Sequence, residues 1–114
     1  MQVTERTVGE VTVLDAQGRM ALNDGHGAVK QRVGELLAAG RRQLVLDLGQ
    51  VPYMDSTCVG ELVSAFLTTR TQGGVLKFAG VTGRMAELFT VAKLDTVFEL
   101  FETETAAVRS FSSS

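Results

Sequence analysis

The chain has 114 residues, of which 45% are hydrophobic and 21% are charged, and its formal net charge is −2. The length suits one domain with one core, and the acidic balance argues against nucleic acid or an anionic membrane surface as a partner, because both require clustered Lys and Arg. No apolar run approaches the ~18 residues of a membrane span, and residues 1–6 lack the layout of a signal peptide. A single cysteine permits no internal disulfide, so we expect a soluble, cytoplasmic protein.

The chain opens with the pattern of a β-hairpin. Residues 3–8 and 11–14 have the composition of short strands. Gly9-Glu10 between them is a two-residue turn signal, in which the glycine supplies a positive φ.

A helix and a buried strand follow the hairpin. Asn23 or Asp24 is the expected N-cap of the helix, and Gly40 is placed to end it. Its apolar residues share one face at helical spacing: Val29, Val33, Leu36 and Leu37. Residues 43–48 are too apolar to have a solvated face, so they fit a central strand covered by helices.

The clearest helical period in the chain begins at Ser56 and ends near Thr71. Its apolar residues recur at i, i+3, i+4, i+7 and i+8: Val59, Leu62, Val63, Phe66 and Leu67. This pattern predicts a helix whose apolar face packs on the sheet.

The rest of the chain predicts a strand at 75–79, a helix capped by Thr82, a strand at 96–100 and a last helix capped by Thr103. Strands and helices therefore alternate after the opening hairpin. This order predicts an α/β fold with a mixed, mostly parallel central sheet and about four helices.

The most informative stretch is the start of the helix at Ser56. The first N–H groups of a helix lack intrahelical partners and the helix dipole is positive there, so a phosphate on Ser56 would be well accommodated. Asp55 is the expected N-cap. Local sequence alone leaves Ser56 open as an ordinary first-turn residue, and Thr57 ranks second as a phosphate acceptor.

Other reactive side chains fit structural roles. Cys58 as a nucleophile would need a base, and the one histidine, His26, stands in a distant loop. Asp47 lies at the end of a buried strand, as a phospho-aspartate would, but neither early strand ends in the acidic pair that a receiver domain needs. The sequence contains no Gly-rich phosphate loop and no metal-ligand cluster. We therefore expect no catalytic residue, no metal and no cofactor.

A strand, an Asp-Ser-Thr run, a Val-Gly pair and a helix together resemble the STAS family, the anti-sigma factor antagonists. The usual core of that family is Asp-Ser-Ser/Thr-Gly-Leu-Gly at a strand-to-helix junction. Here it stands as Asp55-Ser56-Thr57-Cys58-Val59-Gly60. Residues 40–48, 51–54, 76–81 and 94–98 also resemble the family. The resemblance covers about residues 3–111 and implies a single STAS domain over 1–114, with a frayed tail at 112–114.

The resemblance implies a non-enzymatic regulator of transcription in bacteria. In the family, an anti-sigma factor that is also a serine kinase phosphorylates the hydroxyl after the Asp, which is Ser56 here. The unphosphorylated domain binds the anti-sigma factor, the phosphorylated domain does not, and a phosphatase resets the switch. Partner contacts map onto residues 55–60, and a monomer is the expected state. Cys58 replaces the usual Gly, which bears on the choice of partner.

Two other functions remain open. The alternative interaction module is an accessory subunit of a lipid-transport ATPase complex, which would dock through the same helix without a phosphate cycle. A small enzyme or nucleotide-binding domain is a third reading, and the lack of a base, a metal site or a phosphate loop argues against it.

Overall fold

The computed structural model describes residues 2–21 and 27–112. Its sheet has four strands in the order β1-β2-β3-β4: β1 (Gln2–Val8), β2 (Val11–Gln17), β3 (Gln43–Gln50) and β4 (Val75–Ala79). The pair β1 and β2 is antiparallel, whereas β2, β3 and β4 run parallel. The predicted mixed, mostly parallel sheet is confirmed.

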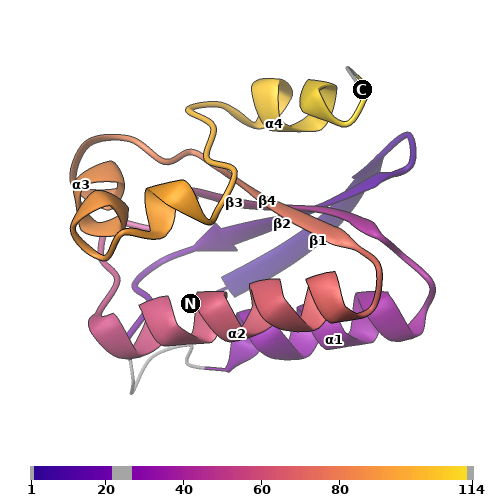
Figure 1. Cartoon of the computed structure of the whole chain (residues 1–114), viewed down its shortest axis with the longest axis horizontal. Helices are drawn as coiled ribbons and strands as arrows, with labels where there is room; N and C mark the ends of the chain where they lie inside the picture. Colours follow the sequence, from indigo (N-terminus) through magenta and orange to yellow (C-terminus); the bar gives the residue numbers. More distant parts are fainter. Residues whose placement is uncertain (1, 22–26, 113–114) are drawn as a thin grey trace.

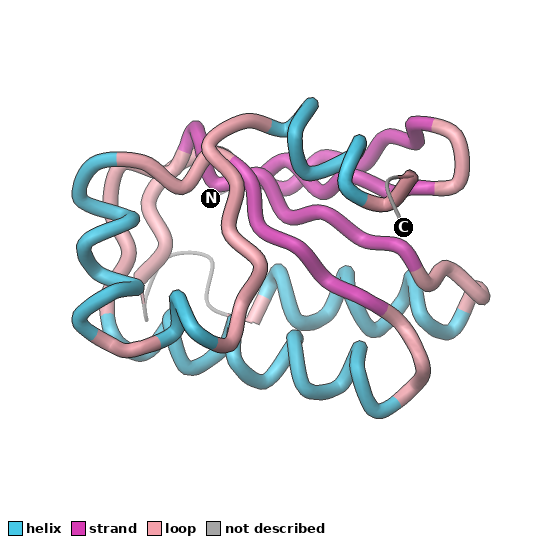
Figure 2. Tube along the Cα trace, turned by 45° about the horizontal axis from the view of Figure 1, so that its top comes forward, coloured by secondary structure: helices cyan, strands magenta, loops and turns pink. Residues whose placement is uncertain are grey.

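The helices cover the two faces of the sheet unequally. The long helices α1 (Ala28–Ala38) and α2 (Ser56–Thr71) lie side by side on one face, and the short α4 (Glu104–Ser110) lies on the other (Figure 1). The helix α3 (Gly83–Val91) lies at the end of the sheet and is followed by a 3₁₀ turn, η1 (Leu94–Thr96) (Figure 2). The ends of β3 and β4 therefore lie near the starts of α2 and α3.

The main core lies between the sheet and the two long helices. Leu14, Leu46 and Phe78 of the central strands are fully buried there. Phe98 closes one end of this core, with its ring centroid 4.4 Å from that of Phe78 and 5.0 Å from that of Phe66. Burying each large apolar side chain contributes about 1.5–3 kcal/mol.

The strand predicted at 96–100 is wrong. Residues 94–96 form η1, and Leu100 contributes only a single parallel bridge to Phe78. The Phe78 N–H group donates to the Glu99 carbonyl at 3.0 Å, and the Phe101 N–H group donates to the Phe78 carbonyl at 2.8 Å. The apolar residues of this segment reflect one anchor, the buried Phe98, rather than the alternation of a paired strand.

The bounds predicted for α2 are confirmed, but its predicted apolar face is rotated. Val59 and Leu62 are buried as predicted, but Leu67 is 52% exposed, and most of the residues against the sheet are smaller. They follow the spacing i, i+4, i+7 and i+11: Cys58, Leu62, Ala65 and Thr69. The Thr69 hydroxyl donates to the Ala65 carbonyl at 2.8 Å, which lets a polar residue occupy the buried face.

The predicted C-terminal end of α1 is confirmed, but its predicted N-cap is not. Gly40 has a φ of 87° and ends the helix as expected, with the Arg41 N–H group donating to the Leu36 carbonyl at 2.9 Å. The predicted N-cap is wrong, because α1 begins after Gly27, which has no side chain to cap with. Asn23 and Asp24 themselves lie outside the described residues.

A cluster of charges lies where α4 meets the outer face of the sheet. Asp15 and Asp47 are register partners on β2 and β3, and Arg6 of β1 binds the carboxylate of Glu104 with both NH groups. Burial raises the pKa of Asp47, and its hydrogen bond with Glu104 and the charge of Asp15 raise that pKa further. The Arg6 hydrogen bond lowers the pKa of Glu104. The Gly49 N–H group opposes the rise in the pKa of Asp47, but the net direction is upward. Of the two carboxyl groups, Asp47 is therefore the one that takes up a proton first as the pH falls, and its O–H group then donates a hydrogen bond to Glu104.

The variant Asp47→Asn is expected to raise the free energy of unfolding at neutral pH by about 1 kcal/mol. The reason is that an amide N–H group can donate to Glu104 at any pH, whereas the carboxyl group of Asp47 can donate only when it is protonated. Its side-chain oxygen still accepts the Gly49 N–H group. A raised pKa in the folded state means that the stabilisation by Asp47 is complete below pH 3.8 and is lost as the pH rises through the folded-state pKa. Urea denaturation from about pH 4 to about pH 8 should show the variant's advantage growing with pH.

The matched control is Asp95→Asn, which removes the same charge from an exposed position on η1. It should leave the difference from wild type constant over the same pH range. A lower stability of Asp47→Asn at every pH would show that Asp47 acts as a carboxylate and contradict the shared proton.

Candidate functional site

The candidate site is built on the loop that joins β3 to α2. Asp55 has an extended backbone, and its side chain accepts the Cys58 N–H group at 3.0 Å, so it is the N-cap that the sequence predicted. The Asp55 N–H group donates to the Met20 carbonyl at 3.1 Å, and the Met20 N–H group donates to the Tyr53 carbonyl at 2.9 Å. The segment that follows β2 thus holds the loop in place, through an isolated parallel bridge between Met20 and Met54. A cap of this kind contributes about 0.5–2 kcal/mol.

Among the predicted site residues Asp55 is half-buried, and the others divide into an exposed set and a buried set. Ser56 and Thr57 are the first two residues of α2 and are exposed, as is Gly60 one turn later. Cys58 and Val59 point into the core. The side chains that a partner can reach are therefore those of the exposed set, and the buried pair positions them.

Cys58 has the environment of a structural thiol. Burial raises its pKa to about 12, and the hydrogen bond and charge of Asp55 act in the same direction. The thiol is therefore neutral near pH 7, which fits packing rather than nucleophilic chemistry. His26, the base considered from the sequence, lies outside the described residues.

Glu61 is the residue that sequence reasoning missed. Its side chain is only 6% exposed. One carboxylate oxygen accepts the Gly27 N–H group at 2.7 Å, and the other accepts the Lys30 N–H group at 3.1 Å. Glu61 of α2 therefore caps α1, and its negative charge lies at the positive end of that helix. The available signal was a carboxylate beside the apolar face of α2, together with a glycine where α1 begins.

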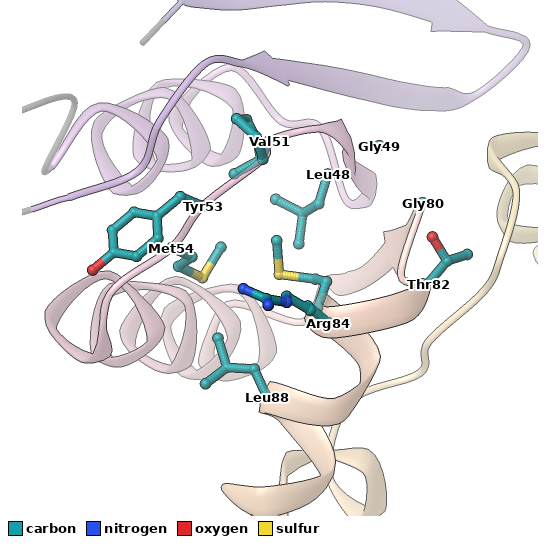
Figure 3. A pocket seen from close by; sticks show the side chains of 11 residues that line it. Leu48, Gly49, Val51, Tyr53, Met54, Gly80, Thr82, Arg84 and Leu88 are labelled. Atoms are coloured by element: carbon teal, nitrogen blue, oxygen red, sulfur yellow. The ribbon is translucent and has the colours of Figure 1, made fainter.

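A hollow of about 370 Å³ opens beside the site, between the β3–α2 and β4–α3 loops (Figure 3). Its floor is apolar: Leu48, Val51, Met54, Met85 and Leu88. Tyr53, Thr82 and Arg84 supply the polar groups at its rim. The two loops cross closely, since a Cβ on Gly80 would lie 2.4 Å from the Gly49 nitrogen, and Gly80 has a φ of 69°. Glycine at position 80 is thus required for this arrangement.

Residues 2–21 and 27–112 contain neither a candidate metal site nor a helix that could span a membrane. No group of three or more His, Cys, Asp and Glu residues there could hold a metal ion. In the same part of the chain, every helix is too short or too polar to cross a lipid bilayer.

Comparison with known proteins places these features in context. A family model described as "Mlab, STAS domain" matches residues 3–102. The anti-sigma-B factor antagonist of Listeria monocytogenes is 36% identical over 61 residues, which are 54% of this chain and 54% of that protein. The anti-sigma-B factor antagonist of Bacillus subtilis is 34% identical over 64 residues, 56% of this chain and 59% of that protein. The chain thus spans little more than half the length of the curated relatives it matches.

Solved structures share the fold at lower identity. An anti-sigma factor antagonist from Mycobacterium paratuberculosis has a TM-score of 0.80 and 21% identity, covering 96% of this chain and 92% of that one. Bacillus SpoIIAA in its phosphorylated form has a TM-score of 0.73 and 14% identity, covering 96% and 99%. Unphosphorylated SpoIIAA has the same TM-score and identity, covering 99% and 100%.

The variant Glu61→Ala is expected to lower the free energy of unfolding by about 2–4 kcal/mol, because two N–H groups at the start of α1 lose their charged acceptor. Glu61→Gln keeps one acceptor and should fall between wild type and Glu61→Ala. Urea denaturation followed by circular dichroism measures both.

Glu35→Ala is the control, since Glu35 is exposed on α1 and lies 3.8 Å from Arg32 in a surface ion pair. It should change stability by less than about 0.5 kcal/mol. If Glu61→Ala unfolds at the same urea concentration as Glu35→Ala, the capping role of Glu61 is wrong.

Proposed function

This chain belongs to the STAS family, and we propose that it is an anti-sigma factor antagonist switched by phosphorylation of Ser56. The observation that carries the proposal is the exposed hydroxyl of Ser56 directly after the capping Asp55. The curated relatives of this chain are anti-sigma-B factor antagonists, which supports the same function. The protein acts by binding, and neither a cofactor nor a catalytic residue is part of the proposal.

Accessibility supports Ser56 as the acceptor. A kinase must reach the hydroxyl from solvent. Ser56 is the first residue of α2, so no preceding helical turn covers its side chain. Thr57 is also exposed and is the second candidate acceptor. Cys58, the next residue along the chain, is fully buried, so the accessible hydroxyls of the first turn of α2 are those of Ser56 and Thr57.

The switch acts through charge rather than through refolding. Phosphorylation of Ser56 would add about −1.5 to −2 charges at neutral pH. The helix start stabilises that charge by about 0.3–1 kcal/mol, while Asp55, already engaged with the Cys58 N–H group, repels it. In the comparison above, the two forms of SpoIIAA match this chain with the same TM-score. A phosphate that leaves the fold intact must act by changing the charge of the surface that the partner contacts.

The size of the effect is sufficient for partner exchange. A partner that packs on Ser56 would have to bury an unpaired charge once the residue is phosphorylated, which costs about 2–5 kcal/mol. This corresponds to about 30-fold to several-thousand-fold in affinity. The partner proposed is the anti-sigma factor, acting as the serine kinase, and a phosphatase that removes the phosphate from Ser56 completes the cycle.

Gly60 supports a partner surface along the first turns of α2. Glycine inside a helix costs about 1 kcal/mol relative to alanine. The fold gives no steric reason for it here, because a Cβ on Gly60 would meet nothing within 4 Å. Close approach of a partner backbone would explain the glycine at position 60, because a side chain there would keep the partner away.

A second candidate function is an accessory subunit of a lipid-transport ATPase complex. The family model that matches is the Mlab type of STAS domain, which keeps this candidate open. It uses the same exposed start of α2 for docking, but it requires no phosphate on Ser56.

The first test uses three baits in native lysate: wild type, Ser56→Ala and Ser56→Asp. An anti-sigma factor kinase should be retained by Ser56→Ala and lost from Ser56→Asp, because the added carboxylate meets the partner as the phosphate would. Thr57→Ala is the matched control, and it should still acquire the phosphate if Ser56 is the acceptor. The intact mass of the endogenous protein should show the phosphate. A transporter ATPase retained by all baits, with no mass shift, would favour the second candidate.

The second test uses Gly60→Ala. The extra Cβ should raise the free energy of unfolding by about 1 kcal/mol and weaken binding of the captured partner by about tenfold or more. Gly34→Ala on α1 is the control, because Gly34 is also an exposed helix residue with nothing within 4 Å of its Cβ position. It should stabilise the fold equally and leave binding unchanged. Equal binding by both variants would remove Gly60 from the interface.

A further inference from the structure

Arg84 is an exposed cation at the rim of the hollow beside Ser56. It stands on the first turn of α3, and Figure 3 shows its side chain extending over the hollow in the direction of Met54. Among the described residues it makes no hydrogen bond or ion pair. Other arginines of the chain are engaged: Arg6 with Glu104, Arg32 with Glu5, and Arg41 with Thr12. The guanidinium of Arg84 is therefore available to an incoming anion.

The start of α3 adds to the positive potential at the same rim. The N-cap Thr82 makes no capping hydrogen bond with its side chain, and the first turn of α3 contains no acidic residue. By contrast, α1 is capped by Glu61, α2 by Asp55 and α4 by Thr103. Thr82 and Arg84 both line the hollow, so the uncapped helix start and the guanidinium point to the same kind of occupant.

The residues on the floor of the hollow indicate that the occupant also carries an apolar group. Met54, Met85 and Leu88 line it, and methionine side chains adapt readily to the shape of a contacting group. A volume of about 370 Å³ is enough for a branched or aromatic side chain together with a carboxylate. The hollow is thus apolar below and cationic at its rim.

We propose that this hollow receives an acidic residue of the protein partner, whose carboxylate pairs with Arg84, while an adjacent apolar side chain packs on Met85 and Leu88. The inference rests on the proposed function, since the partner is the anti-sigma factor that binds at Ser56. Met54 lines the hollow and directly precedes Asp55 and Ser56, so a partner that covers Ser56 also reaches Arg84. The chain as a whole carries a net charge of −2, so an acidic partner segment finds its favourable electrostatic contact locally at this rim.

The test measures binding of the captured anti-sigma factor to Ser56→Ala protein by calorimetry, at about 50 mM and about 200 mM salt. Adding Arg84→Gln should weaken binding about 10- to 100-fold and reduce its salt dependence. Adding Arg84→Lys should have a smaller effect, because the charge stays but the bidentate geometry is lost. Adding Leu88→Ala should weaken binding without changing its salt dependence. Arg70→Gln is the matched control, an exposed arginine in the last turn of α2, and should bind like the parent.

The outcomes separate this inference from the proposed function. If Arg84→Gln binds like the parent while Ser56→Asp still loses the partner, the inference is overturned and the proposed function stands. If no partner distinguishes Ser56→Ala from Ser56→Asp, both fail. Amide chemical shifts of the unbound protein test a small anion instead. Saturation of shifts around Arg84 by micromolar inorganic phosphate or acetate, lost in Arg84→Gln, would assign the hollow to a free anion and overturn the inference.

Discussion

The arrangement of the candidate site depends on one buried carboxylate. Glu61 leaves α2 and bonds two N–H groups at the start of α1, so each long helix fixes the other on the sheet. A carboxylate with 6% exposure would be costly to bury without such partners. Because Ser56 and Gly60 belong to the same turns of α2 as Glu61, their position is set by this contact. The exposed start of α2 is therefore a surface on a rigid base.

Rigidity supports the proposal that a small chemical change at Ser56 controls binding. The capping bond of Asp55 and the Met20 bonds to the loop already occupy the backbone around Ser56. A charge added at Ser56 has few ways to move the surrounding chain, and it therefore changes the electrostatic surface that a partner meets. The buried Cys58 beneath this surface belongs to the core and keeps the first turn of α2 anchored.

Local patterns predicted the elements whose causes are local. The strand at 75–79 and the helix from Ser56 to Thr71 have the predicted bounds, because a helical period and the Gly73-Gly74 break are both readable in sequence. The Asp55 cap was readable for the same reason. The segment at 96–100 failed because one long-range contact, Phe98 in the aromatic group, decides its path.

The missed parts of the site have non-local causes. The acceptor for the start of α1 comes from Glu61 of another helix, which no reading of the residues before α1 could find. The rotation of α2 that exposes Leu67 follows from the small residues that face the sheet, and hydrophobicity alone ranked Leu67 as buried. The hollow forms only where two loops from different strands meet at Gly49 and Gly80.

The position of Tyr53 gives this protein an intrinsic optical label. The chain has one tyrosine and no tryptophan. That tyrosine lies at the mouth of the hollow, 47% exposed, with the Arg19 guanidinium carbon 5.0 Å from its ring centroid. Emission excited in the near ultraviolet therefore comes from one place, three residues before Ser56. Any event at this end of the molecule can be followed in the unmodified protein through the brightness of a single ring.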